Sequence, residues 1–385
     1  MIVIKKNNNT IYLSSPTMNG YEMNYIQEAF ATNWIAPLGK NVDEFENEIA
    51  LYVGVGYAAA LSAGTAALHL AVKLAGIEPG DTVLSSSLTF AATCNPVVYE
   101  RGRLVFIDAE KDTWNMSPEA LEEGFRKYPN TKAVILAHLY GTPAKLDKII
   151  NICNKYGAVL IEDAAEALGS SYKGKKCGSF GKYGILSFNG NKIITTSGGG
   201  MLLSDKAEDI QKAKFWSTQS REPARHYEHK EIGYNYRMSN IVAGIGRGQL
   251  ITLEEYKMKK QKIYGEYRNA FSKIPGLAMN PLNDDGESNN WLSCITVGEG
   301  WIKQGSTPLK LMETLEKEKI ESRPIWKPMH LQPVYKENEF IQVESCNGCS
   351  VSEDIFNRGL CLPSDIKTSE IDRKKIIDIV SSEFN

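Results

Sequence analysis

The chain has 385 residues, of which 42% are hydrophobic, enough to bury a large core and form two domains. Its 44 Lys and Arg against 46 Asp and Glu give a net charge of -2, which excludes a global basic field for nucleic acid. There is no run of apolar residues long enough for a membrane helix, and the first ten residues, MIVIKKNNNT, lack a signal-peptide segment. We therefore expect a cytoplasmic protein that binds neither nucleic acid nor membrane.

Short apolar runs alternate with helical stretches, which is typical of a wound α/β sheet. Strands are predicted at residues 58–61, 82–85, 103–107, 133–137, 158–161, 184–188 and 201–204. Helices are predicted at 65–75, at 145–156 and over a long stretch, 239–271. From about residue 274 the pattern changes to a smaller α+β segment. We place a domain boundary near residue 255, which gives domains 1–255 and 256–385.

The cysteines and histidines form no metal-ligand pattern. Cys346 and Cys349 have the spacing of a zinc half-site, but no second CxxC accompanies them. His226 and His229 lie three residues apart in HYEH without a third ligand nearby in the sequence. We therefore expect reduced cysteines and no bound metal.

Asp163 and Lys192 follow two of the predicted strands, 29 residues apart. The run AVLI leads to Asp163, and GILSF is followed by Asn-Gly-Asn and Lys192. Taken alone, an Asp at a strand end is usually a helix cap, and a Lys after a turn is usually solvated. Together, the two strand ends present an acid and an amine at a common edge of the sheet.

This pair matches what pyridoxal phosphate requires of a protein. The cofactor withdraws electrons best when its ring nitrogen is protonated, and a buried carboxylate such as Asp163 favours that state by ion pairing. The aldehyde must be held by an amine that can lose its proton, which burial of Lys192 favours. Ser187 supplies a hydroxyl near Lys192, and residues 62–69 (SAGTAALH) form a turn into a helix whose N-terminus suits a phosphate.

Five motifs in this order carry a resemblance to a known family: SAGTAALHLA (62–71), IEDAAEALGS (161–170), SFNGNKIITTSGGGML (187–202), GYNYRMSNI (233–241) and RPIWKPMH (323–330). They resemble the nucleotide-sugar aminotransferases of the DegT/StrS type, and are most similar to enzymes of bacillosamine-type sugar synthesis and of bacterial exopolysaccharide clusters. The resemblance covers nearly the whole chain. It implies the fold-type I architecture, with a seven-stranded, mostly parallel sheet in a large α/β domain and a smaller α+β C-terminal domain.

The resemblance also implies roles for individual residues. Lys192 corresponds to the lysine that bonds to pyridoxal 5'-phosphate, and Asp163 to the acid on its ring nitrogen. The other cofactor-binding positions are Gly64, Thr65 and Ser187 for the phosphate, Phe90 for stacking on the ring, and Asn235 for the phosphate of the neighbouring subunit. Asn235 therefore implies a homodimer with shared active sites.

Glu166 departs from a common form of the family pattern. Many members carry a neutral donor at this position, which faces the phenolic oxygen of the cofactor. A carboxylate beside a phenolate is repelled unless it is protonated or separated by water. Glu166 is assigned to the site without a defined role.

The substrate-facing positions are Trp34, Asn191, Arg221, Arg323, Trp326 and His330. Trp34 has a ring that could stack on a sugar, and Arg221 could bind a diphosphate or the carboxylate of the amino donor. A structural role is an equal alternative for each of these residues.

The implied reaction moves an amino group from L-glutamate to C4 of a 4-keto-6-deoxy nucleotide sugar, in particular a UDP-linked 2-acetamido sugar, for surface or exopolysaccharide glycans. Amination at C3 of a dTDP-linked keto sugar is an alternative. Lys192 argues against a related sugar 3-dehydratase, in which histidine replaces the lysine. Lys192 and Asp163 together weigh against a regulatory or binding protein, because a binder needs no covalent bond to a cofactor.

Overall fold

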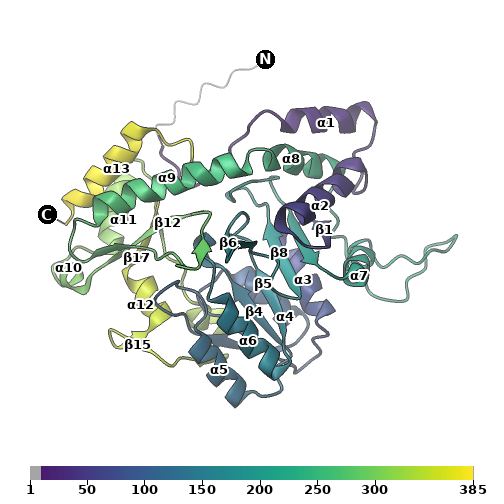
Figure 1. The fold of residues 1–385 in the computed structure, drawn as a ribbon, viewed down its shortest axis with the longest axis horizontal. Helices are drawn as coiled ribbons and strands as arrows, with labels where there is room; N and C mark the ends of the chain where they lie inside the picture. The colour runs from purple at the N-terminus through teal and green to yellow at the C-terminus, as the bar shows by residue number, and fades with distance from the viewer. Residues whose placement is uncertain (1–9, 385) are drawn as a thin grey trace.

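The computed structural model describes residues 10–384; residues 1–9, part of the segment assessed above for a signal peptide, and residue 385 lie outside the described residues. An eight-stranded sheet forms the centre of the fold, in the order β1-β9-β8-β5-β4-β2-β3-β14 (Figure 1). Its strands are β1 (Tyr57–Leu61), β2 (Thr82–Ser86), β3 (Arg103–Ile107), β4 (Ala133–Ala137), β5 (Val159–Asp163), β8 (Tyr183–Ser187), β9 (Gly200–Ser204) and β14 (Glu339–Ile341). Only β9 runs antiparallel to its neighbours, so the predicted α/β class with a mostly parallel sheet is confirmed.

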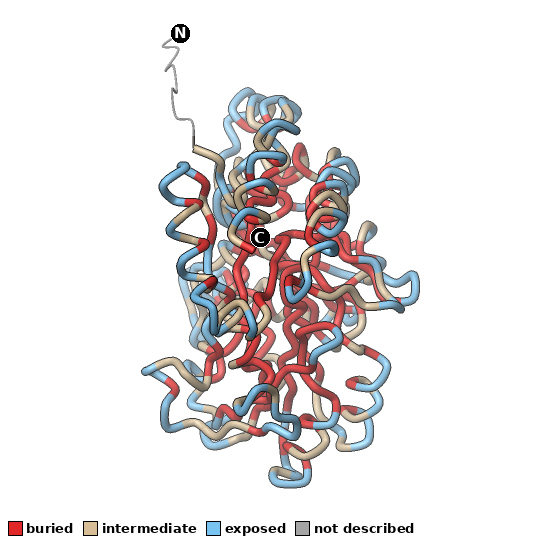
Figure 2. The backbone as a smooth tube through the Cα atoms, turned by 90° about the vertical axis from the view of Figure 1, so that its left-hand side faces the viewer, coloured by how far each residue is buried: buried red, intermediate tan, exposed pale blue. Residues whose placement is uncertain are grey.

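Both faces of this sheet are covered by helices, because successive side chains along a strand point to opposite faces and both sets are apolar. In β4, Ala133 and Ile135 join the core under one set of helices, and Val134 and Leu136 join the core under the other. The first face carries α3 (Gly64–Leu74), α4 (Asn95–Tyr99) and α7 (Ala207–Ser217). The second carries α2 (Lys40–Val53), α5 (Pro118–Lys127) and α6 (Leu146–Tyr156). Figure 2 shows the buried chain concentrated between these helical layers.

The seven predicted strands agree with the structure to within two residues at each end, but the expected strand count was wrong. The eighth strand, β14, comes from the C-terminal part of the chain and pairs in parallel with β3. With three residues it is too short to show a periodic apolar pattern. The sheet edge formed by β3 supplies the backbone partners that make it a strand.

The predicted helix 239–271 is two helices, α8 (Asn240–Leu250) and α9 (Leu253–Phe271). At the break the hydroxyl of Thr252 donates to the carbonyl of Gln249 and accepts from the Asn19 amide, at 3.3 and 2.8 Å. Such local side-chain bonds compete with the helical ladder. Helix α8 packs on α1 (Glu22–Ala31) and α2, and α9 runs on toward the second sheet (Figure 1).

The second sheet has the order β10-β12-β17-β13 and packs against α9, α11 and α13. Its elements are β10 (Leu277–Met279), β12 (Ser293–Val297), α11 (Pro308–Lys317), β13 (Arg323–Pro324), β17 (Gly359–Leu362) and α13 (Glu370–Ser382). Shorter elements are β6 (Ser171–Tyr172), β7 (Lys175–Lys176), β11 (Gly286–Glu287), α10 (Glu299–Lys303), β15 (Ser345–Cys346), β16 (Cys349–Ser350), α12 (Val351–Arg358) and the 3-10 turns η1 (Ala91–Thr93), η2 (Leu139–Gly141), η3 (Met329–Leu331) and η4 (Pro333–Tyr335). The boundary near residue 255 stays a prediction.

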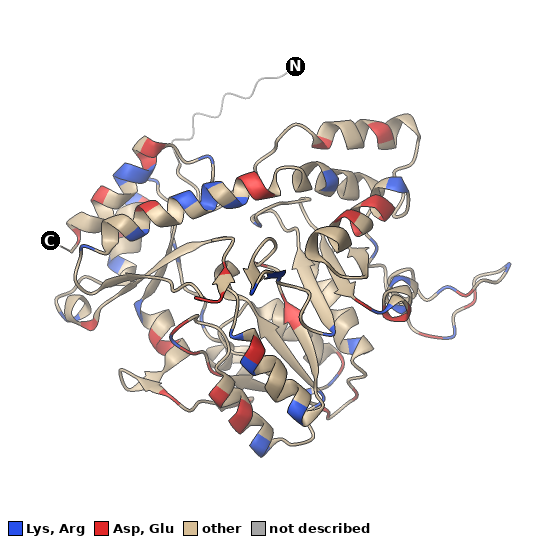
Figure 3. Ribbon diagram, viewed as in Figure 1, with Lys and Arg blue, Asp and Glu red and all other residues tan. Residues whose placement is uncertain are grey.

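Charged residues of both signs are interspersed along the helices, as the balanced composition leads us to expect (Figure 3). Among residues 10–384 no helix is both long and apolar enough to cross a bilayer.

Asp108, directly after β3, fixes α12 to the large sheet. Its carboxylate accepts hydrogen bonds from the N–H groups of Val351 and Ser352, at 3.1 and 3.0 Å, and is almost completely buried.

Replacing Asp108 by Ala leaves both N–H groups buried without a partner, so we expect the free energy of unfolding to fall by about 2 kcal/mol or more. Urea unfolding followed by circular dichroism measures this. Asp284→Ala, in an exposed loop, is the control and should change stability by less than ~0.5 kcal/mol; equal midpoints for both variants would contradict the anchoring role.

Candidate active site

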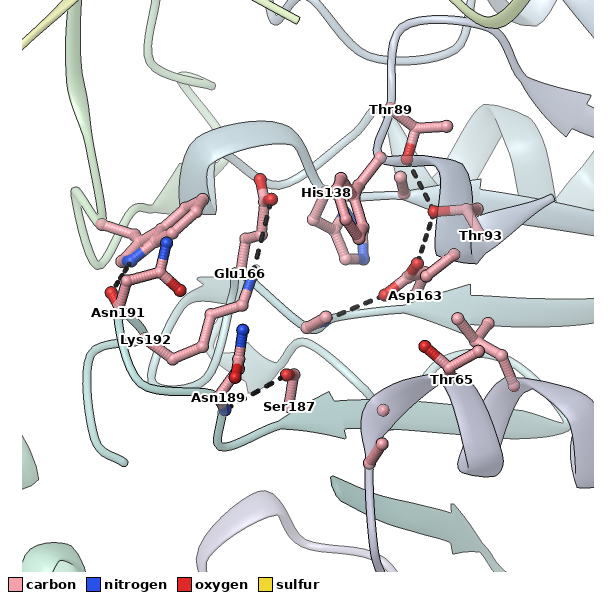
Figure 4. A pocket seen from close by; sticks show the side chains of 18 of the residues that line it. Thr65, Thr89, Thr93, His138, Asp163, Glu166, Ser187, Asn189, Asn191 and Lys192 are labelled. Carbon is pink, nitrogen blue, oxygen red and sulfur yellow. Dashed lines mark hydrogen bonds and ion pairs between the residues drawn. The ribbon is translucent and has the colours of Figure 1, made fainter. Parts of the chain in front are cut away.

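A cavity of about 290 Å³ lies at the carboxyl edge of the large sheet. The ends of β5 and β8, the N-terminus of α3 and the turn η1 after β2 form its floor and sides, and two tryptophans from the C-terminal part of the chain, Trp291 and Trp326, form a wall. Open α/β sheets bind ligands at this edge because parallel strands all end there. Figure 4 shows the polar side chains that point into the cavity.

Asp163 is the last residue of β5 and is buried under the cavity. Its Oδ2 accepts a hydrogen bond from the Thr93 hydroxyl at 2.7 Å, and its Oδ1 accepts from the N–H of Ala165 at 3.1 Å. Burial nevertheless raises the pKa of the Asp163 carboxyl. Within residues 10–384 no Lys, Arg or His forms an ion pair with this carboxylate, so its charge lacks a cationic partner in the protein.

Lys192 follows β8 after a tight turn in which its N–H donates to the Asn189 carbonyl at 3.0 Å. Its Nζ lies 3.6 Å from Oε1 of Glu166 and 4.1 Å from the centre of the Trp291 ring. The side chain reaches the same cavity as Asp163 (Figure 4). The predicted pairing of an acid and an amine at one sheet edge is therefore present in the geometry.

Glu166 also lines the cavity, next to Lys192. Its Oε2 accepts the N–H of Tyr140 at 2.6 Å, and its side chain is buried. Burial raises the pKa of Glu166 to about 7, and the neighbouring Lys192 opposes part of this rise. The carboxyl group therefore exists in both protonation states near neutral pH.

The N-terminus of α3 forms the opposite end of the cavity. Ala63 precedes the helix without a side-chain cap, so the first N–H groups of α3, at Gly64 and Thr65, have no intrahelical acceptors. A Cβ at Gly64 would lie 3.1 Å from Cβ of Ser187, so glycine permits the close approach of the helix to the end of β8. The free N–H groups of Gly64 and Thr65, the hydroxyls of Thr65 and Ser187, and the helix dipole together make an anion-binding site.

The other residues predicted for the site divide into two groups. Phe90, Asn191 and Trp326 line the cavity, and the rings of Phe90 and Trp326 lie 5.3 Å apart. Trp34, Arg221, Asn235, Arg323 and His330 do not line it. Trp34 faces a separate hollow near α1 and α2, and Arg323 pairs with Glu321 at the rim of a cavity that adjoins the site.

Three of the residues outside the cavity have identifiable surroundings. Arg221 pairs with His229 across an exposed hairpin that extends away from the body beyond α7 (Figure 1). Asn235 is exposed and accepts a hydrogen bond from Gln219 at 3.2 Å. His330 is buried beside Ser87, with a ring-nitrogen distance of 2.7 Å, and stacks on Phe340. The roles of these residues stay predictions.

Sequence reasoning missed several lining residues, among them Thr89, Thr93, His138, Asn189 and Trp291. His138 directly follows β4, and Asp163 is the last residue of the neighbouring β5, so the strand-end position of His138 was a usable signal. Trp291 lies about a hundred residues from Lys192, and only tertiary packing brings the two together.

His138, Glu162 and Cys177 form a buried group whose possible ligand atoms lie within 4.8 Å of one another. However, Glu162 already accepts hydrogen bonds from His138 and from the backbone N–H groups of Gly178, Phe180 and Gly181. Nδ1 of His138 accepts the N–H of Ala144 at 3.1 Å. These donors already bind the histidine and the carboxylate, which favours a structural cluster over a metal site.

The residues of the cavity fit pyridoxal 5'-phosphate. A protonated ring nitrogen would give Asp163 the positive charge that its buried carboxylate lacks, and the N-terminus of α3 would receive the phosphate. Lys192 would supply the amine for the aldehyde. Fold and site together define a pyridoxal phosphate-dependent enzyme of fold-type I.

Comparisons with known proteins agree with this class. The model of the DegT/DnrJ/EryC1/StrS aminotransferase family matches residues 16–381. The chain is 49% identical to EpsN of Bacillus subtilis (strain 168), whose name includes the words pyridoxal phosphate-dependent aminotransferase, over 97% of this chain and 96% of that protein. It is 35% identical to the GDP-perosamine synthase of Caulobacter vibrioides, over 95% of this chain and 96% of that one. A solved DegT DnrJ EryC1 StrS aminotransferase from Brucella abortus superposes with a TM-score of 0.85 at 29% identity, covering 95% of each chain.

The chain belongs to the DegT/DnrJ/EryC1/StrS aminotransferase family. It is a pyridoxal phosphate-dependent sugar aminotransferase, which confirms the predicted family, enzyme class and cofactor.

Lys192 can be tested as the covalent anchor. We expect Lys192→Ala to abolish turnover, because no other amine among residues 10–384 lines the cavity, while the cofactor should still bind through Asp163 and the N-terminus of α3. Borohydride reduction followed by peptide mass spectrometry should place the cofactor on Lys192 in the wild type and leave the variant unmodified. Lys206→Ala, on the exposed surface after β9, is the control and should behave as wild type. An adduct on a different lysine would refute the assignment.

Asp163→Asn keeps the hydrogen-bonding shape but removes the charge. We expect the rate to fall by at least ~10², the scale of one preorganised electrostatic partner, with little change in unfolding temperature. Asp205→Asn is a matched control, since Asp205 also follows a strand and accepts a backbone N–H, from Gly56 at 2.9 Å, but lies outside the cavity. Steady-state kinetics compares the two. Near-normal activity of Asp163→Asn would show that Asp163 serves only as a strand-end cap.

Proposed function

We propose that this protein transfers the amino group of L-glutamate to C4 of a 4-keto-6-deoxy nucleotide sugar, in particular a UDP-linked 2-acetamido sugar, for the synthesis of surface or exopolysaccharide glycans. The observation that carries the proposal is the meeting of Lys192 and Asp163 in one cavity whose mouth is aromatic and amide-lined. Pyridoxal 5'-phosphate, when bound, withdraws electrons from the carbon that gains or loses a proton and carries the amino group between the two substrates.

The protein's own residues perform binding, orientation and proton transfer. Asp163 holds a proton on the ring nitrogen of the cofactor, and the N-terminus of α3 fixes the phosphate. Lys192, once released, moves a proton to and from the reacting carbon, a contribution of typically ~10²–10⁴ in rate for a positioned base. The walls formed by Trp291, Trp326 and Phe90 exclude water from these charges.

A sugar acceptor is supported by the chemistry of the cavity mouth. Trp291, Trp326 and Phe90 present aromatic faces, and Asn189 and Asn191 present neutral amides. Among the described residues that line this cavity, Lys192 is the one Lys or Arg. A neutral keto sugar needs stacking surfaces and hydrogen bonds rather than an additional cation at its reacting carbon.

The adjoining cavity supports a nucleotide diphosphate attached to that sugar. It has a volume of about 530 Å³ and shares Asn191, Trp291 and Trp326 with the main cavity. It adds Arg323 and Lys327, two cations that suit a diphosphate. Binding energy from the nucleotide can be used to orient the distant C4 carbon, so the nucleotide should affect turnover as well as affinity.

A GDP-linked 4-keto sugar is the second candidate. The 35% identical relative from Caulobacter vibrioides is a GDP-perosamine synthase, and that name favours a guanine nucleotide. The choice of nucleotide depends on contacts to the base rather than on the chemistry at Lys192.

The substrate is tested by comparing kcat/KM with L-glutamate as donor for four acceptors: the UDP-linked 2-acetamido-4-keto-6-deoxy hexose, the GDP-linked 4-keto-6-deoxy hexose, the free keto sugar without a nucleotide, and pyruvate. We expect the UDP-linked sugar to be preferred and both the free sugar and pyruvate to react at least ~10²-fold less well, because they lack the nucleotide's binding energy. Nuclear magnetic resonance of the product should place the amine at C4. A preference for pyruvate would refute the sugar assignment, and an amine at C3 would refute the position.

We also predict an active homodimer in which Asn235 completes the phosphate site of the partner subunit. After subunit exchange, a mixture of Lys192→Ala and Asn235→Asp proteins should regain partial activity, because one of the two hybrid sites carries neither lesion. A mixture of Lys192→Ala and Asp163→Asn is the control and should gain nothing, since each hybrid site then keeps one lesion. Absence of complementation under demonstrated exchange would contradict shared sites.

A further inference from the structure

Glu166 is held by an unusual backbone conformation. Its Oε2 accepts the N–H of Tyr140 at 2.6 Å, and Tyr140 has a φ of 52°, a left-handed conformation that is costly for a residue with a side chain. Tyr140 is itself buried, and its hydroxyl accepts the N–H of Trp326 at 3.1 Å. The backbone strain therefore aims one N–H group at one oxygen of Glu166 and leaves Oε1 free to face Lys192.

Trp291 lies against the amine of Lys192 and is also held by hydrogen bonds. Its ring nitrogen donates to the carbonyl of Asn191, the residue before Lys192, at 2.8 Å. Its own carbonyl accepts from the ammonium of Lys260, at 3.0 Å, and Lys260 also donates to the Ser364 carbonyl at 2.8 Å. Lys260 is a buried lysine that the aminotransferase reaction does not use; it holds the backbone at Trp291, and the bond to the Asn191 carbonyl holds the indole beside Lys192.

The amine of Lys192 lies between these two groups, 3.6 Å from Oε1 of Glu166 and 4.1 Å from the centre of the Trp291 ring. Both contacts attract a positively charged nitrogen, the first through the charge of the carboxylate and the second through the negative face of the ring. Only 12% of the Lys192 side chain is exposed, so water screens these contacts weakly.

We propose that Glu166 and Trp291 form a docking site for the protonated side chain of Lys192, occupied whenever the lysine is not bonded to the cofactor, and that Glu166 accepts the amine's proton when the lysine bonds again. The proposal rests on Lys192 being the cofactor-bonding lysine. In the transfer an N–H bond of the ammonium breaks, an O–H bond forms on Oε1, and the nitrogen lone pair becomes available. No oxidant or reductant is needed.

Burial raises the pKa of Glu166 to about 7, so its carboxyl group can receive a proton and release it again near neutral pH. A carboxylate with an ordinary pKa would be a poor acceptor for this transfer. The other titratable groups that face the pair are Asp163 after β5, His138 and Tyr140 around η2, and Cys294 and Cys361 behind Tyr140. Asp163 also attracts the ammonium, but among the described acids only Glu166 lies within ion-pair distance of Nζ, at 3.6 Å, so Glu166 and Trp291 are the groups in direct contact with the amine.

The test uses the full chain loaded with pyridoxamine 5'-phosphate, which has no aldehyde and leaves Lys192 free. Trace labelling with acetic anhydride from about pH 6 to 10, read by peptide mass spectrometry, reports the fraction of each lysine that is neutral. Glu166→Gln keeps the acceptor for Tyr140 but removes the charge. We expect the midpoint of the Lys192 labelling profile to move to lower pH and its rate at pH 8 to rise at least about threefold, with the high-pH plateau unchanged.

Two further variants frame this result. Trp291→Phe keeps a ring with a weaker negative face and should move the midpoint in the same direction by less. Glu255→Gln is the matched control, because Glu255 pairs with Lys259 on the exposed side of α9, at 2.6 Å, and should leave the Lys192 profile unchanged. Circular dichroism monitors folding. If Glu166→Gln does not fold, Trp291→Phe decides the question, and an unmoved midpoint in that variant overturns the docking site.

An unchanged midpoint in folded Glu166→Gln overturns the proposal. So does a higher plateau at an unchanged midpoint, because that result shows only a looser pocket. The borohydride adduct separates this failure from a failure of the proposed function. If the adduct is on Lys192 while the labelling profile does not move, the docking site falls and the aminotransferase assignment stands; if the adduct is on another lysine, both fall.

Discussion

Three ionisable side chains line one cavity, and the rest of the active-site structure depends on the energetic cost of burying them there. Asp163 and Glu166 are buried carboxyl groups whose pKa values are raised by burial, and Lys192 is a nearly buried amine 3.6 Å from Glu166. A buried charge without a partner costs several kcal/mol, so each group needs fixed donors or a counter-charge. Thr93 and Ala165 donate hydrogen bonds to Asp163, and Tyr140 donates one to Glu166. Asp163 still has no counter-charge, which a cationic ring nitrogen would supply.

The topology of the sheet brings these donors together. β4, β5 and β8 are parallel neighbours, so the residues at or just beyond their carboxyl ends, His138, Asp163 and Lys192, meet at one edge. β2 is the next neighbour of β4, and the loop after it carries Phe90 and Thr93 to the same edge. A site assembled from successive strand ends is stiff, because each end is held by its own ladder of hydrogen bonds.

The aromatic wall of the site comes from the part of the chain after residue 255, and three links hold that part in place. β14 extends the large sheet, the carboxylate of Asp108 binds the N-terminus of α12, and buried Lys260 binds the carbonyls of Trp291 and Ser364. Burial lowers the pKa of Lys260 to about 8, so this link loses charge under mildly alkaline conditions. The position of Trp291 against Lys192 therefore depends on contacts between elements far apart in the sequence.

Local patterns in the sequence determined most of the large sheet and the reactive pair. Apolar runs of four or five residues located seven strands, and two of those runs end shortly before Asp163 and Lys192, because the end of a strand is marked locally by a change from apolar to polar residues. The tertiary structure alone decided the eighth strand β14, the break before α9, and the neighbours of Lys192. Glu166 lies near Asp163 in the sequence, but its contact with Lys192 and the approach of Trp291 and Tyr140 arise from packing across 26 to 99 residues, over which side-chain periodicity carries no information.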